Sequence, residues 1–172
     1  MNSEMLSLVS TVAIIVVVLL MIGFGWRNRL RRQADVAPLP EVPLEPGVPG
    51  ARAEGQYVAS TTAGDWLDRI AVHSLGIRTN AVLSVYSHGV LLDRSGAPAV
   101  YIPAANLTGV RQESGMAGKF VEKDGLLVIT WELGTHTLDT GFRTRRAADK
   151  DALYDSLQQL IAAAPQADPS GK

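Results

Sequence analysis

The chain has 172 residues, which is room for one ordinary domain and a short appendage. It contains no cysteine, and this excludes a disulfide framework and a thiolate metal site. The 16 Lys and Arg residues against 17 Asp and Glu residues give a net charge of −1, and residues 55–172 hold 11 basic and 12 acidic residues. Because nucleic-acid-binding domains normally carry a basic excess, this balance argues against nucleic acid as a partner.

An uncharged apolar run over residues 5–26 is the most strongly patterned segment of the chain. Thirteen of its residues are Leu, Ile, Val or Phe, which together favour insertion into a membrane by about 4–8 kcal/mol. A helix of this length reaches roughly 33 Å, enough to cross a hydrocarbon core of about 30 Å. The hydroxyls of Ser7, Ser10 and Thr11 can donate to backbone carbonyls within the helix, so they oppose insertion little. The run therefore predicts a single transmembrane helix.

The charges that flank this run predict its orientation. Only Glu4 is charged before it, whereas Arg27, Arg29, Arg31 and Arg32 follow it directly. The positive-inside rule places such a flank in the cytoplasm, so we expect residues 1–4 outside the plasma membrane and the rest of the chain inside. The alternative is a cleaved signal peptide. It is disfavoured because a signal peptide begins with basic residues and ends at a cleavage site with small residues.

Residues 27–54 are predicted to be a basic flank followed by a proline-rich linker. Proline lacks a backbone donor and pushes the residue before it into extended conformations, so we expect neither a helix nor a central strand. The expected state is a spacer that lets the following domain reorient. The PxxP spacing could also recruit an SH3-like partner, although a plain spacer is favoured. The linker prolines are Pro38, Pro40, Pro43, Pro46 and Pro49.

From residue 55 the pattern changes to short apolar stretches separated by turns. In residues 126–133 apolar and polar side chains alternate towards the end, with Leu127, Ile129, Trp131 and Leu133 on one face. A two-residue loop of Gly134 and Thr135 leads to a return strand over residues 136–142. Residues 87–89 predict another hairpin loop, with Gly89 available for a positive φ. The other predicted strands cover residues 57–61, 67–72, 81–86, 90–94, 99–102 and 107–113.

The last periodic segment predicts an amphipathic helix over residues 147–164. Leu153, Leu157, Leu160 and Ile161 recur at helical spacing. Seven or eight antiparallel strands followed by one helix is the layout of a pleckstrin-homology-like (PH-like) barrel or sandwich, here over residues 55–164, with the helix covering one open end. A lipocalin-like barrel and a generic β-sandwich remain as alternatives. Residues 165–172 are expected to be a disordered tail.

Five segments of the domain carry motifs shared with a known family. They are residues 64–69 (GDWLDR), 89–94 (GVLLDR), 101–103 (YIP), 115–122 (GMAGKFVE, with Trp131) and 138–143 (LDTGFR). These segments resemble actinobacterial single-pass membrane proteins with a PH-like domain, which are often loosely labelled transporters. The resemblance implies a gene located near pyrimidine-biosynthesis genes. It supplies no ligand and no catalytic residue.

Candidate catalytic and metal-binding groups are scattered along the sequence. The histidines lack metal-ligand spacing, and no nucleophile or oxyanion element accompanies the paired carboxylates. The pair Gly118-Lys119 lacks the flanking residues of a phosphate-binding loop, so a flexible loop is expected there. We therefore expect no enzyme, no metal, no cofactor and no small-molecule substrate. The groups considered are His73, His88, His136, Asp65, Asp68, Glu122 and Asp124.

Arg143, Arg145 and Arg146 form a small basic cluster before the predicted C-terminal helix. Each could add about 1 kcal/mol of attraction to anionic lipid near a membrane surface. A specific inositide site is not expected, because residues 61–66 are uncharged to acidic. The sequence favours a non-catalytic module, integral to the lipid bilayer, whose PH-like domain docks a protein partner at the inner membrane face. The alternative is a domain that senses anionic lipid through these three arginines.

Overall fold

The computed structural model describes residues 3–32, 36–120 and 122–164. The chain separates into two compact units, Met1–Asp35 and Val36–Lys172. Residues 1–2 of the predicted outer segment and the predicted disordered tail over residues 165–172 lie outside the described residues. The same holds for the side chains of Arg29, Arg31 and Arg32.

The first unit contains one helix, α1 (Ser3–Arg32). Its segment Ser7–Gly25 has a mean hydropathy of 2.8 and is long enough to cross a membrane. The hydroxyls of Ser10 and Thr11 donate to the Ser7 carbonyl at 2.8 and 2.9 Å, as the sequence predicts. By length and composition, this unit therefore offers one candidate membrane span.

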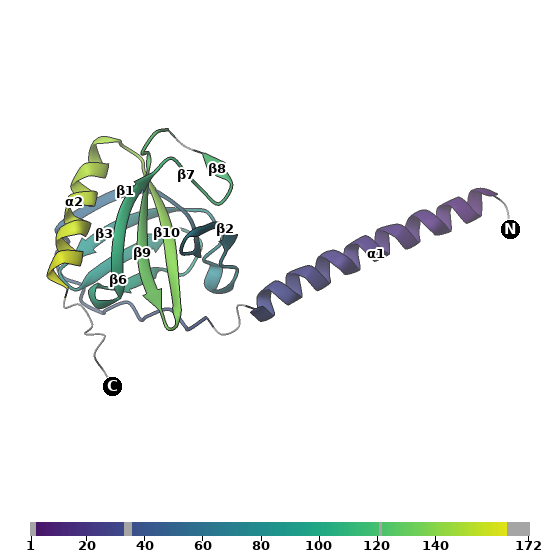
Figure 1. The fold of residues 1–172 in the computed structure, drawn as a ribbon, viewed down its shortest axis with the longest axis horizontal. Coiled ribbons are helices and arrows are strands. Elements are labelled where there is room, and N and C mark those ends of the chain that lie inside the picture. The colour runs from purple at the N-terminus through teal and green to yellow at the C-terminus, as the bar shows by residue number, and fades with distance from the viewer. Residues whose placement is uncertain (1–2, 33–35, 121, 165–172) are drawn as a thin grey trace. The chain divides into compact units, whose positions relative to one another are not determined.

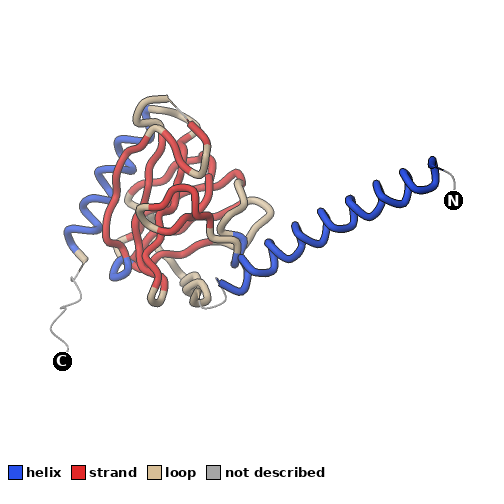
Figure 2. Tube along the Cα trace, turned by 45° about the vertical axis from the view of Figure 1, so that its right-hand side comes forward, coloured by secondary structure: helices blue, strands red, loops and turns tan. Residues whose placement is uncertain are grey.

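The second unit is an antiparallel β-structure with one covering helix (Figures 1 and 2). Its main strands are β1 (Ala51–Thr62), β2 (Asp65–Arg69), β3 (Thr79–Tyr86), β4 (Gly89–Arg94), β5 (Val100–Pro103), β6 (Leu107–Glu113), β9 (Leu126–Leu133) and β10 (His136–Thr144). Its other elements are β7 (Gly115–Met116), β8 (Lys119–Phe120), the 3₁₀ turns η1 (Val72–Ser74) and η2 (Ala104–Asn106), and α2 (Ala148–Ala163).

One eight-stranded sheet organises these elements. Its order is β5-β4-β3-β1-β10-β9-β6, with β2 paired to β1 off this path. Two meanders, β1-β3-β4-β5 and β6-β9-β10, are thus joined where β1 pairs with β10. A register shift between Tyr57 and Ala59 bends β1 at this junction, so that one long strand serves both halves. The mainly β architecture with a C-terminal helix is the one the sequence predicts.

Several predicted strand limits need correction. β1 begins at Ala51, because Ala51 to Glu54 carry backbone donors beyond the last linker proline and pair with β3. The expectation that no central strand lies before residue 55 is therefore wrong. β2 covers Asp65–Arg69 rather than residues 67–72, since the chain turns at η1. The limits predicted for β6 and β9 are confirmed.

Two glycine segments also differ from their predictions. Gly89 does not take a positive φ; it lies in β4, where a Cβ atom would stand 2.5 Å from the Ile102 carbonyl oxygen. The segment expected as a flexible loop after residue 114 is a β7–β8 hairpin. Its two turn residues, Ala117 and Gly118, have φ values of 54° and 75°, the left-handed pair that tight hairpins use.

The core lies on the concave side of the sheet. The predicted alternation in β9 is confirmed, since Leu127, Ile129, Trp131 and Leu133 all belong to one buried cluster. α2 adds Leu153, Leu157 and Leu160 to the same cluster and packs on β1, β3 and β6. A smaller cluster on the opposite face explains why that face of β9 is apolar as well; it contains Val58, Ala59, Met116, Ala117, Leu126 and Val128.

A chain of buried hydrogen bonds crosses the core. The Trp131 indole donates to the Thr140 hydroxyl at 2.8 Å, which bonds to the Ser60 hydroxyl at 2.6 Å. The Tyr57 hydroxyl continues the chain to Ser60 and donates to the Leu75 carbonyl at 2.7 Å. Burial raises the pKa of Tyr57 to about 12, so its hydroxyl keeps its proton.

Residues 36–50, which we call the strap, lie against the second unit. Val36 is 6% exposed within the core, and Ala37 and Leu39 pack against that core. At the other end, the Gly50 amide donates to the Val85 carbonyl at 2.8 Å. The strap is therefore not the freely reorienting spacer that its proline content predicts.

Candidate binding groove

A polar groove of about 760 Å³ lies where the start of α2 meets β1, β3 and β10. One wall is the loop that precedes β9, and the floor is formed by residues of β1 and β3. Its charged residues come from four separate parts of the chain. They are Glu54, Glu122, Lys123, Arg143, Arg145 and Lys150.

Ion pairs hold the arginines of the groove. Arg143 Nη2 lies 2.7 Å from Glu122 Oε2, and Arg145 Nη1 lies 3.2 Å from Glu54 Oε2. Both pairs are exposed enough for solvent to screen them, so each is worth little for stability and can exchange its carboxylate for another. The Lys150 ammonium donates to the Asp124 carbonyl at 2.7 Å and fixes the loop to α2.

Two glycines allow this arrangement. At Gly55 a Cβ atom would stand 2.1 Å from the Arg143 carbonyl oxygen, so only glycine lets β1 and β10 approach here. At Gly125 a Cβ atom would stand 2.6 Å from the Glu122 side chain. Glu122 thus folds back over Gly125 to reach Arg143.

The lining of the groove is more basic than the chain as a whole. Four basic and two acidic residues line it, a difference of +2, whereas the whole chain carries −1. Bonding to its own backbone N–H, with a lesser contribution from Arg143, holds the pKa of Glu122 below its usual value against the opposing effect of burial. Glu122 is therefore an anion at neutral pH. Arg143 is consequently paired with a carboxylate in the absence of any ligand.

The structure brings two of the three predicted lipid-contact arginines into this groove. Arg143 and Arg145 line it, whereas Arg146 makes two hydrogen bonds of 2.9 Å to Asp149 at the start of α2. Sequence reasoning missed Glu54 and Glu122 as groove residues, because both are distant in sequence from the arginines they pair with.

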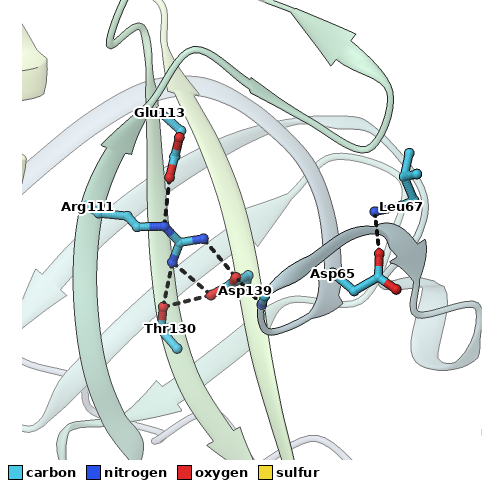
Figure 3. A network of polar contacts seen from close by, with 7 residues as sticks. Asp65, Leu67, Arg111, Glu113, Thr130 and Asp139 are labelled. Carbon is cyan, nitrogen blue, oxygen red and sulfur yellow. Dashed lines mark hydrogen bonds and ion pairs between the residues drawn. The ribbon is translucent and has the colours of Figure 1, made fainter.

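A second polar cluster lies across β6, β9 and β10 (Figure 3). The Arg111 guanidinium donates to both oxygens of Asp139, at 3.0 and 2.8 Å, and Thr130 donates to the same carboxylate at 2.7 Å. Burial alone would raise the pKa of Asp139, but bonds from Arg111, Thr130 and the Gly64 amide together lower it. Because these partners satisfy the carboxylate, the cluster serves as a structural staple between strands.

Two carboxylates that were considered as catalytic candidates, Asp65 and Asp68, have structural tasks. Within β2, Asp65 accepts the Leu67 amide at 3.1 Å (Figure 3) and the Asp68 amide at 3.3 Å. The Thr62 hydroxyl donates to Asp68 at 2.7 Å. Within the described ranges, no three His, Cys, Asp or Glu side chains are grouped so that they could hold a metal ion.

A model of the Bacterial PH domain-like family matches residues 36–158, more than two thirds of the chain. The chain belongs to this family. The matched region of the PH-like domain begins at Val36, where the second unit also begins, so it includes the strap. No curated protein matches the chain.

Several solved structures are similar to this PH-like domain. A structure of Vav1 with an allosteric inhibitor is 14% identical, with 83% of this chain and 34% of that chain covered and a TM-score of 0.41. The apo structure of the activated truncation of Vav1 is 13% identical, with coverages of 83% and 33% and the same TM-score. The C-terminal domain of an unknown protein from Leishmania infantum is 11% identical, with coverages of 81% and 98% and a TM-score of 0.40. The chain spans about a third of the length of the Vav1 chains.

Proposed function

We propose that this chain is a membrane-anchored, non-catalytic interaction module whose PH-like domain docks a protein partner through the groove. The observation that carries the proposal is the charge state of the groove: Arg143 and Arg145 each hold a carboxylate, and the lining still has a basic excess. An acidic protein surface can replace Glu122 and Glu54 on these arginines, one carboxylate for another.

The charge state of the groove also distinguishes protein docking from the alternative function, the sensing of anionic lipid. A sensor of anionic lipid would attract the membrane through the net positive charge of Arg143, Arg145 and Arg146. In this domain all three guanidiniums have carboxylate partners, which reduces their long-range attraction. A protein surface that exchanges pairs at short range is therefore favoured over a lipid headgroup layer.

The membrane part of the proposal is supported by α1 and its charges. We infer that Ser7–Gly25 spans the plasma membrane, with the N-terminus outside and the PH-like domain in the cytoplasm, because the arginine-rich flank follows the span. Only residues 33–35 separate α1 from Val36. As part of the same proposal, we infer that the chain is related to actinobacterial single-pass membrane proteins, whose genes lie near pyrimidine-biosynthesis genes.

Orientation can be measured with C-terminal fusions. A green fluorescent protein fused after residue 172 should be fluorescent, and alkaline phosphatase at the same place should be inactive, because the C-terminus is inside. Replacing Arg27, Arg29, Arg31 and Arg32 with alanine should reduce this difference several-fold. An active phosphatase, or a mature protein that begins after Trp26, would contradict the membrane topology.

The groove can be tested by crosslinking from native membranes. A photoreactive residue at Lys123, which lines the groove, should capture a partner, whereas the same residue at exposed Glu132 should not. Replacing both Arg143 and Arg145 with alanine should lower capture at least tenfold, about 1.4 kcal/mol of binding free energy.

A vesicle experiment tests the alternative function, the sensing of anionic lipid. Residues 36–172 alone should not float with vesicles that contain anionic lipid. Flotation that disappears when Arg143, Arg145 and Arg146 are changed to alanine would establish lipid sensing in place of protein docking.

A further inference from the structure

The strap has a repeating side that faces the PH-like domain. Its half-buried residues include Pro40, Pro43, Pro46 and Pro49, at every third position, while the residues between them are exposed. A polyproline II helix has three residues per turn, so this spacing aligns side chains along one edge. We call these four residues the proline ridge. Every third residue in this part of the strap is therefore a half-buried proline.

A small aromatic cluster is bonded to this ridge at Pro46. The rings of Tyr86 and His88 are stacked with centroids 5.6 Å apart and planes 5° apart. His88 Nε2 lies 2.9 Å from the Pro46 carbonyl oxygen, and His88 Nδ1 lies 2.7 Å from the Tyr101 hydroxyl. The Tyr101 hydroxyl oxygen also lies 3.0 Å from the His88 carbonyl oxygen, which places Tyr101 against the β3–β4 hairpin.

Gly89 lets Tyr101 approach the β3–β4 hairpin closely. A Cβ atom there would stand 2.7 Å from the Tyr101 hydroxyl oxygen, so the tyrosine ring lies directly over the glycine. Polyproline segments bind to grooves lined by aromatic side chains, and their stiff backbone loses little entropy on docking. The cluster has the aromatic side chains that such a site needs.

The middle of the strap is weakly held. Among the described residues, the hydrogen bond to His88 is the one found for residues 40–49. Leu44 and Val48 are fully or almost fully exposed, so they add no buried apolar area. The ends differ, because Val36 lies in the core and Gly50 bonds to β3. A segment fixed at both ends with few contacts between them opens at low free-energy cost.

We propose that Tyr86, His88 and Tyr101 form a polyproline-binding site that the strap occupies in cis, and that a proline-rich segment of another protein takes its place. The replacing segment carries prolines at every third residue in an extended conformation. The site lies on the β3–β4 hairpin and the adjacent strand β5, and it shares no residue with the groove. It therefore adds a second, independent recognition surface to the domain.

Competition with the strap decides the affinity for such a segment. The strap is tethered to the domain, so it competes for the site at a high effective concentration. The apparent affinity for a segment of another protein equals the intrinsic affinity multiplied by the fraction of molecules in which the site is open. Replacing prolines of the strap should weaken its own binding to the site. The site should then be available to a segment of another protein.

The test uses the full chain in detergent micelles and a fluorescent peptide with the sequence of residues 38–49 (PLPEVPLEPGVP). The double variant Pro43→Ser, Pro46→Ser should bind the peptide at least about tenfold more tightly than the unaltered chain. Adding His88→Ala to this variant should weaken binding at least tenfold, whereas adding His136→Ala should leave it unchanged. A peptide with all its prolines replaced by serine should not bind.

The proposal would be overturned if the double variant, with its circular dichroism intact, did not bind the peptide. Binding that His88→Ala does not affect would also overturn it. Self-association of the chain that the peptide abolishes would overturn it as well, because the occupant would then be a second copy. A second measurement avoids altering the prolines. The chain has no cysteine, so spin labels at Leu44→Cys and Asp93→Cys report the strap directly. Saturating peptide should shift their distance distribution, and an unchanged distribution would refute displacement.

Discussion

Replacing Arg111 with methionine should lower the free energy of unfolding of the PH-like domain by about 3 kcal/mol at pH 7, the lower end of the range for a broken buried ion pair. The side chain of Asp139 is 5% exposed, and Arg111, itself 43% exposed, donates to both of its oxygens. Without the guanidinium, a buried carboxylate keeps only Thr130 and the Gly64 amide as partners. The loss can be measured by urea unfolding monitored by the fluorescence of the domain's tryptophans, Trp66 and Trp131.

The effect of this substitution should depend on pH in a definite direction. In the unaltered domain the pKa of Asp139 is below its ordinary value of 3.8, so the pair stabilises the fold above that pH and the contribution disappears as pH falls through the lower folded pKa. In the variant, burial dominates and raises the pKa of Asp139, so the neutral acid is favoured. The two proteins should therefore differ most at pH 7, and the difference should shrink as the pH falls below 3.8.

An exposed ion pair provides the control for this prediction. Arg145 and Glu54 are 77% and 68% exposed in their side chains, so Arg145→Met should cost at most about 1 kcal/mol. A second variant removes both charges of the Arg111–Asp139 pair. If Arg111→Met with Asp139→Asn is no more stable than Arg111→Met alone at pH 7, the unpaired carboxylate is not the source of the loss.

The parts of the fold that sequence predicts best are those with local causes. β9 and its hairpin are set by alternating side chains and a two-residue turn, in which Gly134 has a φ of 60°. α2 is set by leucines at helical spacing, and three of them are buried. Each of these patterns lies within about 20 residues of chain, so pairing partners and buried faces can be derived from neighbours alone.

The strap and the groove depend on contacts that no local pattern contains. Proline content excludes a helix over the strap, but it does not say whether an extended chain docks; that depends on the distant His88 and on the pocket for Val36. The groove arises because Arg145 meets Glu54 across 91 positions and Arg143 meets Glu122 across 21. A sequence reader sees the arginines as an isolated basic cluster, because their partners lie on other strands and loops.

Gly55 shows what kind of signal could have located the groove. It stands inside a strand, where glycine has no favourable propensity, and such a glycine often marks a close approach of two backbones. In this domain the approaching backbone is that of Arg143 in β10. The glycine therefore indicated a crossing point, although only the structure identifies which strand crosses there.

Removing the Trp131 side chain should have the largest effect on the domain. Trp131 is fully buried at the centre of the core, and Trp131→Ala should cost about 3–5 kcal/mol through lost burial and the cavity left behind. Small domains have about 5–15 kcal/mol of stability in total, so the variant should be partly or wholly unfolded at 37 °C. Circular dichroism during thermal unfolding measures this without a tryptophan reporter.

A more conservative change separates packing from hydrogen bonding. Trp131→Phe keeps most of the apolar volume but removes the indole N–H donor. The Thr140 hydroxyl, which continues the hydrogen-bonded chain to Ser60 and Tyr57, then loses one partner. Its cost should be smaller than that of alanine, about 1–3 kcal/mol. Glu132→Ala, on the exposed face of the same strand, should change stability by no more than about 0.5 kcal/mol. Equal losses for the phenylalanine and alanine variants would mean that the hydrogen-bonded chain, rather than the packed indole, holds the two halves of the sheet together.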